Sequence, residues 1–140
     1  MMMPVPRRPS VPVPFFAPDR PACVVVIDRD RGWADGLSRV LGQDLFEVHA
    51  GYGWPDLERL VDTQSPTVVV VELGEDIERG LAAIGRLRAG HPSGSLHIVA
   101  TRIDARPADI AAALRAGCDL CLARPASFEA LREIVREAAR

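Results

Sequence analysis

The chain has 140 residues, is 48% hydrophobic and carries a formal net charge of -2. This length suits one domain with a hydrophobic core that needs neither disulfides nor metals. The charge balance gives no electrostatic reason to expect nucleic acid or an anionic membrane as a partner of this chain, and no apolar run approaches the length of a membrane span.

The basic residues and the cysteines carry two further expectations. All 17 basic residues are arginine, and the three cysteines do not form an even framework. We therefore expect reduced thiols and a cytoplasmic location. Cys118 and Cys121 form a lone C-x-x-C with no second pair, which favours core packing over a zinc or redox site. His49, His91 and His97 lie on separate segments, so we expect no metal cluster and no catalytic histidine.

Residues 1–21 hold seven of the twelve prolines. Proline fixes φ and lacks an N–H donor, which discourages both helices and central strands. We predict an extended, largely disordered tail over residues 1–21 and a folded domain over residues 22–140. Pro6–Pro9 has the spacing of a polyproline II ligand, and Phe15 and Phe16 could anchor on a partner. A solvated leader without a partner is the alternative.

Five apolar runs predict buried strands at residues 22–27, 45–50, 67–73, 96–101 and 120–123. The run from Thr67 to Leu73 contains four valines and then Glu72. A strand without polar alternation is typical of a parallel sheet that is covered on both faces. In such a sheet, the residues just past the carboxyl ends of the strands form the ligand crevice.

Apolar residues at helical spacing follow each strand. The expected core-facing residues are Trp33, Leu37, Val40 and Leu41, then Leu57, Leu60 and Val61, then Ile77, Leu81, Ile84 and Leu87, then Ile110, Ala113 and Leu114, and finally Leu131, Ile134 and Val135. The predicted ends are Gly42, Ser65-Pro66, Gly90 and Gly117, with Pro107 in a first turn and Ser127 as an N-cap. Five strands alternating with five helices predict an α/β fold, a doubly wound five-stranded parallel sheet.

Polar residues close four of the predicted strands: Asp28 and Asp30, Glu72, Thr101, and Arg124 followed by Pro125. Their order, spacing and strand context resemble the receiver domain of two-component response regulators, the CheY-like family, across about residues 22–140. The resemblance implies a flavodoxin-like topology and a role in phosphorelay signal transduction.

In that family, an acidic pair after the first strand binds Mg²⁺ and an aspartate after the third strand accepts the phosphoryl group. A hydroxyl residue and a lysine bind the phosphoryl oxygens. Asp28 and Thr101 match the first acid and the hydroxyl residue. Arg29 takes the place of the second acid, Glu72 that of the acceptor and Arg124 that of the lysine. Cys121 stands at the switch position, where the family often has an aromatic residue.

These departures predict an atypical receiver, or pseudo-receiver, that is not phosphorylated. An extra methylene moves the Glu72 carboxylate out of line, and small misplacements of a reacting group can cost on the order of 100-fold in rate. Arg29 repels Mg²⁺, so we expect no cofactor and impaired Mg²⁺ binding. Arg124 weighs less, because this chain uses arginine for every basic residue.

Two interpretations of Glu72 remain open. It could mimic phospho-aspartate by reaching toward Thr101 and Arg124, or the site has decayed and Glu72 pairs with Arg29 or Arg124.

Without an intact phosphoacceptor, we expect no enzymatic activity and a role in protein–protein interaction. The expected interaction face lies on the fourth helix, fifth strand and fifth helix, with mixed charges at Asp109, Arg115, Asp119, Arg132, Glu133 and Arg136. A homodimer through this face is one option, and an ordinary solvated face is the alternative. Two other functions are alternatives. One is a working receiver that uses Asp28 or Asp30 or answers to another input. The other is a small-molecule binder, against which the missing Gly-rich loop argues.

Overall fold

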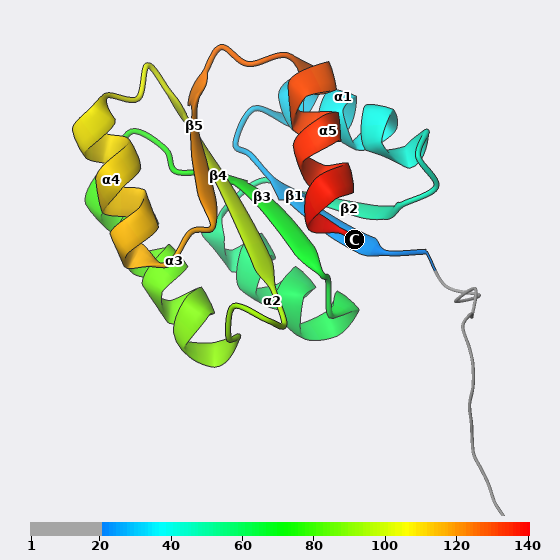
Figure 1. The fold of residues 1–140 in the computed structure, drawn as a ribbon, viewed down its shortest axis with the longest axis horizontal. Helices are drawn as coiled ribbons and strands as arrows, with labels where there is room; N and C mark the ends of the chain where they lie inside the picture. The colour runs from blue at the N-terminus through cyan, green and yellow to red at the C-terminus, as the bar shows by residue number, and fades with distance from the viewer. Residues whose placement is uncertain (1–20) are drawn as a thin grey trace, which may run out of the picture.

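A computed structural model describes residues 21–140. Its five strands form one parallel sheet in the order β2-β1-β3-β4-β5 (Figure 1). The strands are β1 (Cys23–Ile27), β2 (Glu47–Gly51), β3 (Val68–Glu72), β4 (His97–Ile103) and β5 (Leu120–Arg124). The helices are α1 (Arg31–Gly42), α2 (Trp54–Gln64), α3 (Ile77–Gly90), α4 (Pro107–Ala116) and α5 (Phe128–Ala138). The predicted doubly wound α/β fold is confirmed. The polyproline ligand and the aromatic anchor fall within residues 1–20, outside the described residues.

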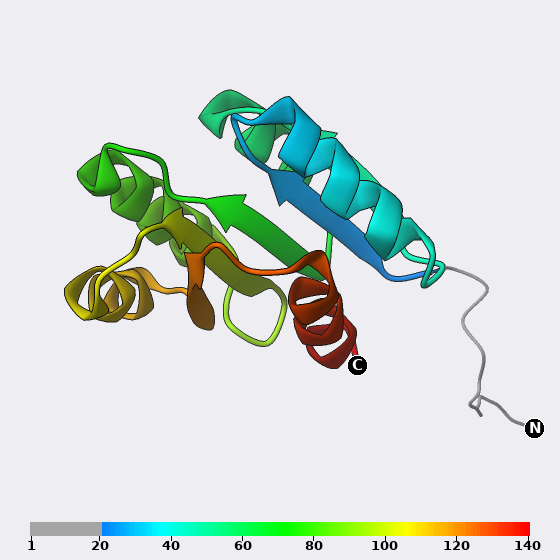
Figure 2. The same ribbon diagram turned by 90° about the horizontal axis from the view of Figure 1, so that it is seen from above.

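Helices cover both faces of the sheet, α1 and α5 on one side and α2, α3 and α4 on the other (Figure 2). This arrangement explains the unbroken valine runs. Val24, Val26 and Val70 pack toward α1 and α5, whereas Val25 and Val69 pack toward α2 and α3. The valines of β1 and β3 therefore have apolar neighbours on both faces of the sheet.

Two predicted strand boundaries differ from the structure by two residues, and the others agree within one. The second strand begins at Glu47 and not at Leu45, because Leu45 adopts a left-handed φ of 65° in the turn after α1 and is 81% exposed. The fourth strand runs beyond Thr101 to Ile103. It is longer because β5 continues beside it, with Ile103 in register with Arg124.

Most of the predicted core residues are buried or partly buried, but Leu114 is 45% exposed. The inner face of α4 consists instead of Asp109 and Ala113, with Ile110 and Ala116 partly buried. Cys118 and Cys121 are buried free thiols in the core, and burial raises the pKa of Cys118 to about 12. Across residues 21–140, no helix is both long and apolar enough to cross a bilayer.

Candidate functional site

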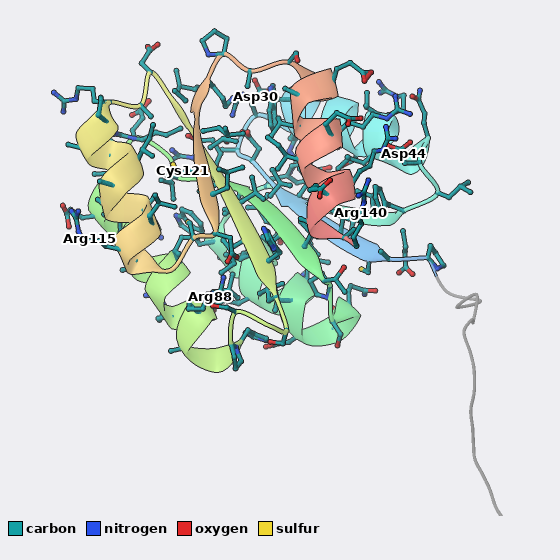
Figure 3. All side chains as sticks on the ribbon, viewed as in Figure 1. Asp30, Asp44, Arg88, Arg115, Cys121 and Arg140 are labelled. Carbon is teal, nitrogen blue, oxygen red and sulfur yellow. The ribbon has the colours of Figure 1, made fainter. Side chains whose placement is uncertain are left out.

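The predicted site residues meet at the carboxyl edge of the sheet. Asp28 follows β1, Glu72 ends β3, Thr101 lies in β4 and Arg124 ends β5. An open pocket of about 510 Å³ lies at this edge; we call it the carboxyl-edge pocket. Its lining residues are Asp28, Arg29, Asp30, Glu72, Gly74, Glu75, Arg102 and Ile103. Figure 3 labels Asp30 at this edge, beside the start of α1.

The strongest contact of the site is a buried ion pair between Asp28 and Arg124. Arg124 Nη1 donates to Asp28 Oδ2 at 2.6 Å, and the two side chains are only 8% and 4% exposed. The other carboxylate oxygen of Asp28 accepts the backbone N–H of Asp30 at 2.8 Å. Both oxygens of Asp28 are therefore occupied by donors from the protein itself.

Trp33 holds the guanidinium of Arg124 from the other side. The Arg124 Cζ atom lies 3.8 Å from the centroid of the Trp33 ring, and Phe128 packs edge-on against that ring with centroids 5.5 Å apart. A desolvated cation over an indole is stabilised by about 2 kcal/mol. The Arg124–Pro125 peptide bond at the end of β5 is cis. Arg124 is thus fixed by an ion pair and by an aromatic face together.

Glu72 and Thr101 lie side by side in register on β3 and β4. Thr101 is fully buried, and its Oγ1 has no hydrogen-bond partner among residues 21–140. Glu72 is partly exposed and faces the pocket, and within the same residues no ion pair or side-chain hydrogen bond of Glu72 is found. Among residues 21–140, Glu72 thus makes no hydrogen bond to Thr101 and no ion pair with Arg29 or Arg124, although it lies beside Thr101.

The side chains of Arg29 and Asp30 both lie against nearby backbone. The guanidinium of Arg29 lies over Gly74, where an added Cβ would stand 2.7 Å from Arg29 Nη2. Gly74 has a left-handed φ of 85°, a conformation that favours glycine. Asp30 is the N-cap of α1, and its Oδ1 accepts the backbone N–H of Trp33 at 3.1 Å.

Arg102 is a site residue that the sequence reasoning missed. It follows Thr101 in β4 and donates to the backbone carbonyls of Gly74 and Glu75 at 3.3 and 3.2 Å. A third bond, to Asp109 at 2.8 Å, ties the β3–α3 loop to α4. The available signal was an arginine directly after Thr101, at the same edge as the other charges.

Asp28, the acid expected to face Mg²⁺, has no free carboxylate oxygen for the ion. This ion needs several free oxygen ligands in near-octahedral geometry. Asp28 already carries a guanidinium and a backbone N–H, and the next position along the chain is Arg29. The cationic group of Arg124 occupies the carboxylate that would otherwise face a metal.

The predicted interaction face is only partly available. Asp109 is buried, and the backbone N–H of Arg106 with the Arg102 guanidinium holds the pKa of that carboxyl below its usual range. Asp119 accepts Arg88 at 2.6 Å and the backbone N–H of Ile98 at 2.7 Å. Both carboxylates are paired within the domain, so neither is a free charge on the surface.

On α5, Arg132 is also engaged internally. It binds both carboxylate oxygens of Asp44 at 2.7 Å, which ties α5 to the turn after α1. Glu133 and Arg136 pair with each other at 2.7 Å on the exposed side of the helix. Arg115 on α4 is exposed and points outward (Figure 3). Cys121, which the resemblance places at a switch position, is buried in the core on the side of α4.

No family model and no curated protein sequence matches the chain. Solved structures do. A response regulator from Thermotoga maritima superposes with a TM-score of 0.77 at 20% identity, over 85% of this chain and 98% of that one. An orphan response regulator of H. pylori gives 0.77 at 18% identity, over 88% and 100%. A putative pilus assembly protein from Burkholderia thailandensis gives 0.72 at 23% identity, over 84% and 98%. The strand order, the crossovers and these superpositions agree, and the chain has the CheY-like fold of response-regulator receiver domains.

Proposed function

We propose that this chain is an atypical receiver domain that acts in signal transduction by protein–protein interaction and accepts no phosphoryl group. The observation that supports the proposal most is the ion pair between Asp28 and Arg124. In receivers, the corresponding groups serve two different ligands, the metal ion and the phosphoryl oxygens. In this chain, Asp28 and Arg124 bind each other.

The energetics of this pair favour a closed site. To bind a cation, Asp28 must release a guanidinium that is buried with it and that also rests on Trp33. Separating a buried pair leaves an uncompensated charge, at a cost of about 3–5 kcal/mol. Mg²⁺ binds such sites weakly and dehydrates reluctantly, so it competes poorly with a guanidinium that is already in place.

The state of the domain is then set by Arg124 and not by Glu72. A phospho-aspartate mimic has to engage the hydroxyl and the cation of the site, but Arg124 is committed to Asp28 and Thr101 Oγ1 accepts and donates no bond within the described residues. Glu72 remains as a solvated carboxylate at the pocket wall. We therefore favour loss of phosphorylation over mimicry.

The interaction face that we propose is smaller than the one expected from sequence. Because Asp109, Asp119 and Arg132 are bound within the domain, we propose that the face centres on Arg115 and Leu114 of α4 and the Glu133–Arg136 pair of α5, which are exposed. A protein partner or a second copy of this chain would contact these groups.

The test is exposure of the full chain to acetyl phosphate and Mg²⁺, followed at once by intact-mass measurement. The matched control is a triple variant, Arg29→Asp, Glu72→Asp and Arg124→Lys, which restores the family pattern. We expect the wild-type mass to stay unchanged and the triple variant to gain one phosphoryl group. A phosphoryl gain by the wild type, traced to Asp28 or Asp30, would make the chain a working receiver and overturn the proposal.

A further inference from the structure

A second cluster of polar side chains lies at the opposite end of β1 and β2, away from the carboxyl-edge pocket. Cys23 opens β1, and Glu47 and His49 come from the first half of β2. Cys23 is in register with Glu47, and Val25 with His49. Side chains two apart on a strand share a face, and so do register partners, which places all three on one side of the sheet.

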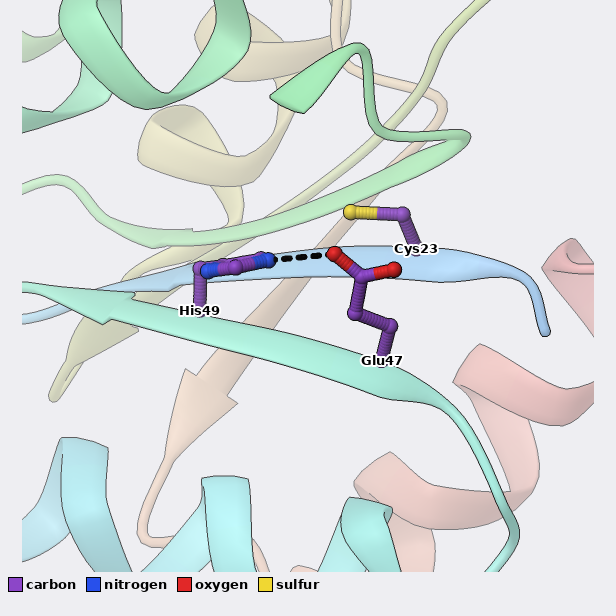
Figure 4. A group of neighbouring side chains, drawn as sticks. All are labelled: Cys23, Glu47 and His49. Carbon is purple, nitrogen blue, oxygen red and sulfur yellow. Dashed lines mark hydrogen bonds and ion pairs between the residues drawn. The ribbon is translucent and has the colours of Figure 1, made fainter. Parts of the chain in front are cut away.

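The three side chains point toward one another (Figure 4). The Cys23 Sγ atom, a carboxylate oxygen of Glu47 and a ring nitrogen of His49 all lie within 4.8 Å of one another. His49 Nε2 and Glu47 Oε2 are 2.7 Å apart. Cys23 and His49 are half-buried and Glu47 is exposed, so the cluster is open to solvent on one side.

The backbone that carries these residues is firmly held. The N–H of Thr67 donates to the carbonyl of Cys23 at 3.0 Å, and the N–H of Glu47 donates to the carbonyl of Ala22 at 3.0 Å. Cys23 is thereby bonded to β3 while its neighbour is bonded to β2. Ligands on paired strands keep their relative positions better than ligands on loops.

The ligand types and their separations suit a tetrahedral divalent ion. Thiolate, imidazole and carboxylate are the three ligands that Zn²⁺ takes in proteins, at about 2.3, 2.0 and 2.1 Å. These bond lengths put neighbouring ligand atoms of a tetrahedral ion about 3.3–3.6 Å apart. The glutamate and histidine atoms need to separate by only a fraction of an ångström, and the thiol atom is already near. Rotations of side chains at the sheet edge are enough.

We propose that Cys23, Glu47 and His49 form a binding site for Zn²⁺, with three protein ligands and a fourth position open to water. Strand register places Cys23 beside Glu47, and the 2.7 Å contact between His49 and Glu47 brings the third ligand type to the same place. The site also clips the edge strand β2 to β1, so an ion that binds only the folded chain would raise its stability. The proposal is independent of the phosphorylation state of the other pocket.

Cobalt titration of the metal-free full chain tests the site, because a thiolate bound to Co²⁺ gives an intense charge-transfer absorption that carboxylate ligands do not give. We expect this band to reach its limit at one equivalent of Co²⁺ and to disappear when Zn²⁺ is added, since Zn²⁺ binds such ligands more tightly than Co²⁺. Cys23→Ser should abolish the band. His49→Gln and Glu47→Gln should weaken binding roughly tenfold or more.

Matched controls remove the same residue types elsewhere. Cys118→Ser and His97→Gln should keep the wild-type titration, because both lie far along the sheet from β2. Glu47 is half-exposed, so Glu47→Gln reports on binding without disturbing the core. The proposal fails if no thiolate band forms, if the band survives in Cys23→Ser, or if Cys118→Ser removes it. A weak spectrum without that band would mean that Co²⁺ sits on carboxylates only, which also contradicts the proposal.

Discussion

Arg124 at the end of the edge strand β5 reaches across the ends of β4 and β3 to pair with Asp28 at the end of β1. The bond from Arg124 Nη1 to Asp28 Oδ2 is 2.6 Å long and joins residues 96 positions apart in the chain. The pair is buried, and the guanidinium of Arg124 lies over the Trp33 ring. In the proposed function, this internal contact takes the place of the metal ion and the phosphoryl group that receivers bind.

The first prediction concerns the stability that this pair carries. Arg124→Met should lower the free energy of unfolding by about 3–5 kcal/mol, because Asp28 is left buried with an uncompensated charge. The double variant Asp28→Leu with Arg124→Met should recover most of that loss, because both charges are gone. Urea unfolding of the single and double variants gives the coupling energy. Additive losses would show that the two residues do not interact.

The second prediction uses the unpaired hydroxyl of Thr101. Its Oγ1 is buried and has no partner in residues 21–140, so it carries a desolvation cost without a hydrogen bond. Thr101→Val keeps the shape and removes that cost, and should leave the protein equally stable or more stable by about 1 kcal/mol. Thermal unfolding is the measurement, with the exposed Thr63→Val as control. A loss of more than about 1 kcal/mol would reveal a partner for the hydroxyl.

The third prediction concerns Arg102, which ties the β3–α3 loop to α4. Arg102→Met should cost about 1–3 kcal/mol and speed amide exchange in residues 74–76, since two backbone carbonyls and a carboxylate lose a charged donor. Arg106→Ala is the control, because that side chain is 83% exposed and its contact with Asp109 is long, at 3.9 Å. Unchanged exchange in the Arg102 variant would refute the role.

The fourth prediction is a pH dependence at the Asp44–Arg132 pair. The hydrogen bonds from Arg132 hold the pKa of Asp44 below its usual value. A lowered pKa in the folded state stabilises the protein above the unfolded value of about 3.9, and this contribution is lost as the pH falls through the folded pKa. Arg132→Gln should therefore be less stable than wild type at neutral pH, and the difference should shrink on acidification.

Urea unfolding at neutral pH and at about pH 3 measures this effect. Arg140→Gln, which removes an exposed pair of 3.5 Å at the chain end, is the control and should change little at either pH. A stability difference for Arg132→Gln that stays constant with pH would mean that Asp44 does not titrate through the pair.

Much of the fold can be predicted from the sequence, because parallel strands that are buried on both faces appear as unbroken valine runs. The run ending at Glu72 located the centre of the sheet, and the polar residues after each run located its carboxyl edge. The turn at Leu45 could not be predicted, because in the sequence an apolar residue in a turn looks like the start of a strand; its left-handed φ appears only in the structure.

The sequence predicted which residues lie at the site better than it predicted which of them pair with each other. Several arginines and carboxylates meet at one edge, and sequence position does not say which cation each acid takes. Arg124 selects Asp28 because Trp33 and the depth of the pair favour a planar guanidinium there. Glu72, which the sequence spacing places at the centre of the site, makes no ion pair or side-chain hydrogen bond among residues 21–140. Cys23 and His49 are 26 positions apart (49 − 23) and meet only through strand register.

The central claim is that the Arg124 guanidinium occupies Asp28 in place of a metal ion. Titration of the full chain with Mg²⁺, followed by the backbone amide resonances of residues 28–30, tests it most directly. The account predicts no saturable shift at millimolar Mg²⁺ in the wild type, whereas Arg124→Ala should acquire one as Asp28 is freed. Saturable shifts centred on Asp28 in the wild type would contradict the claim.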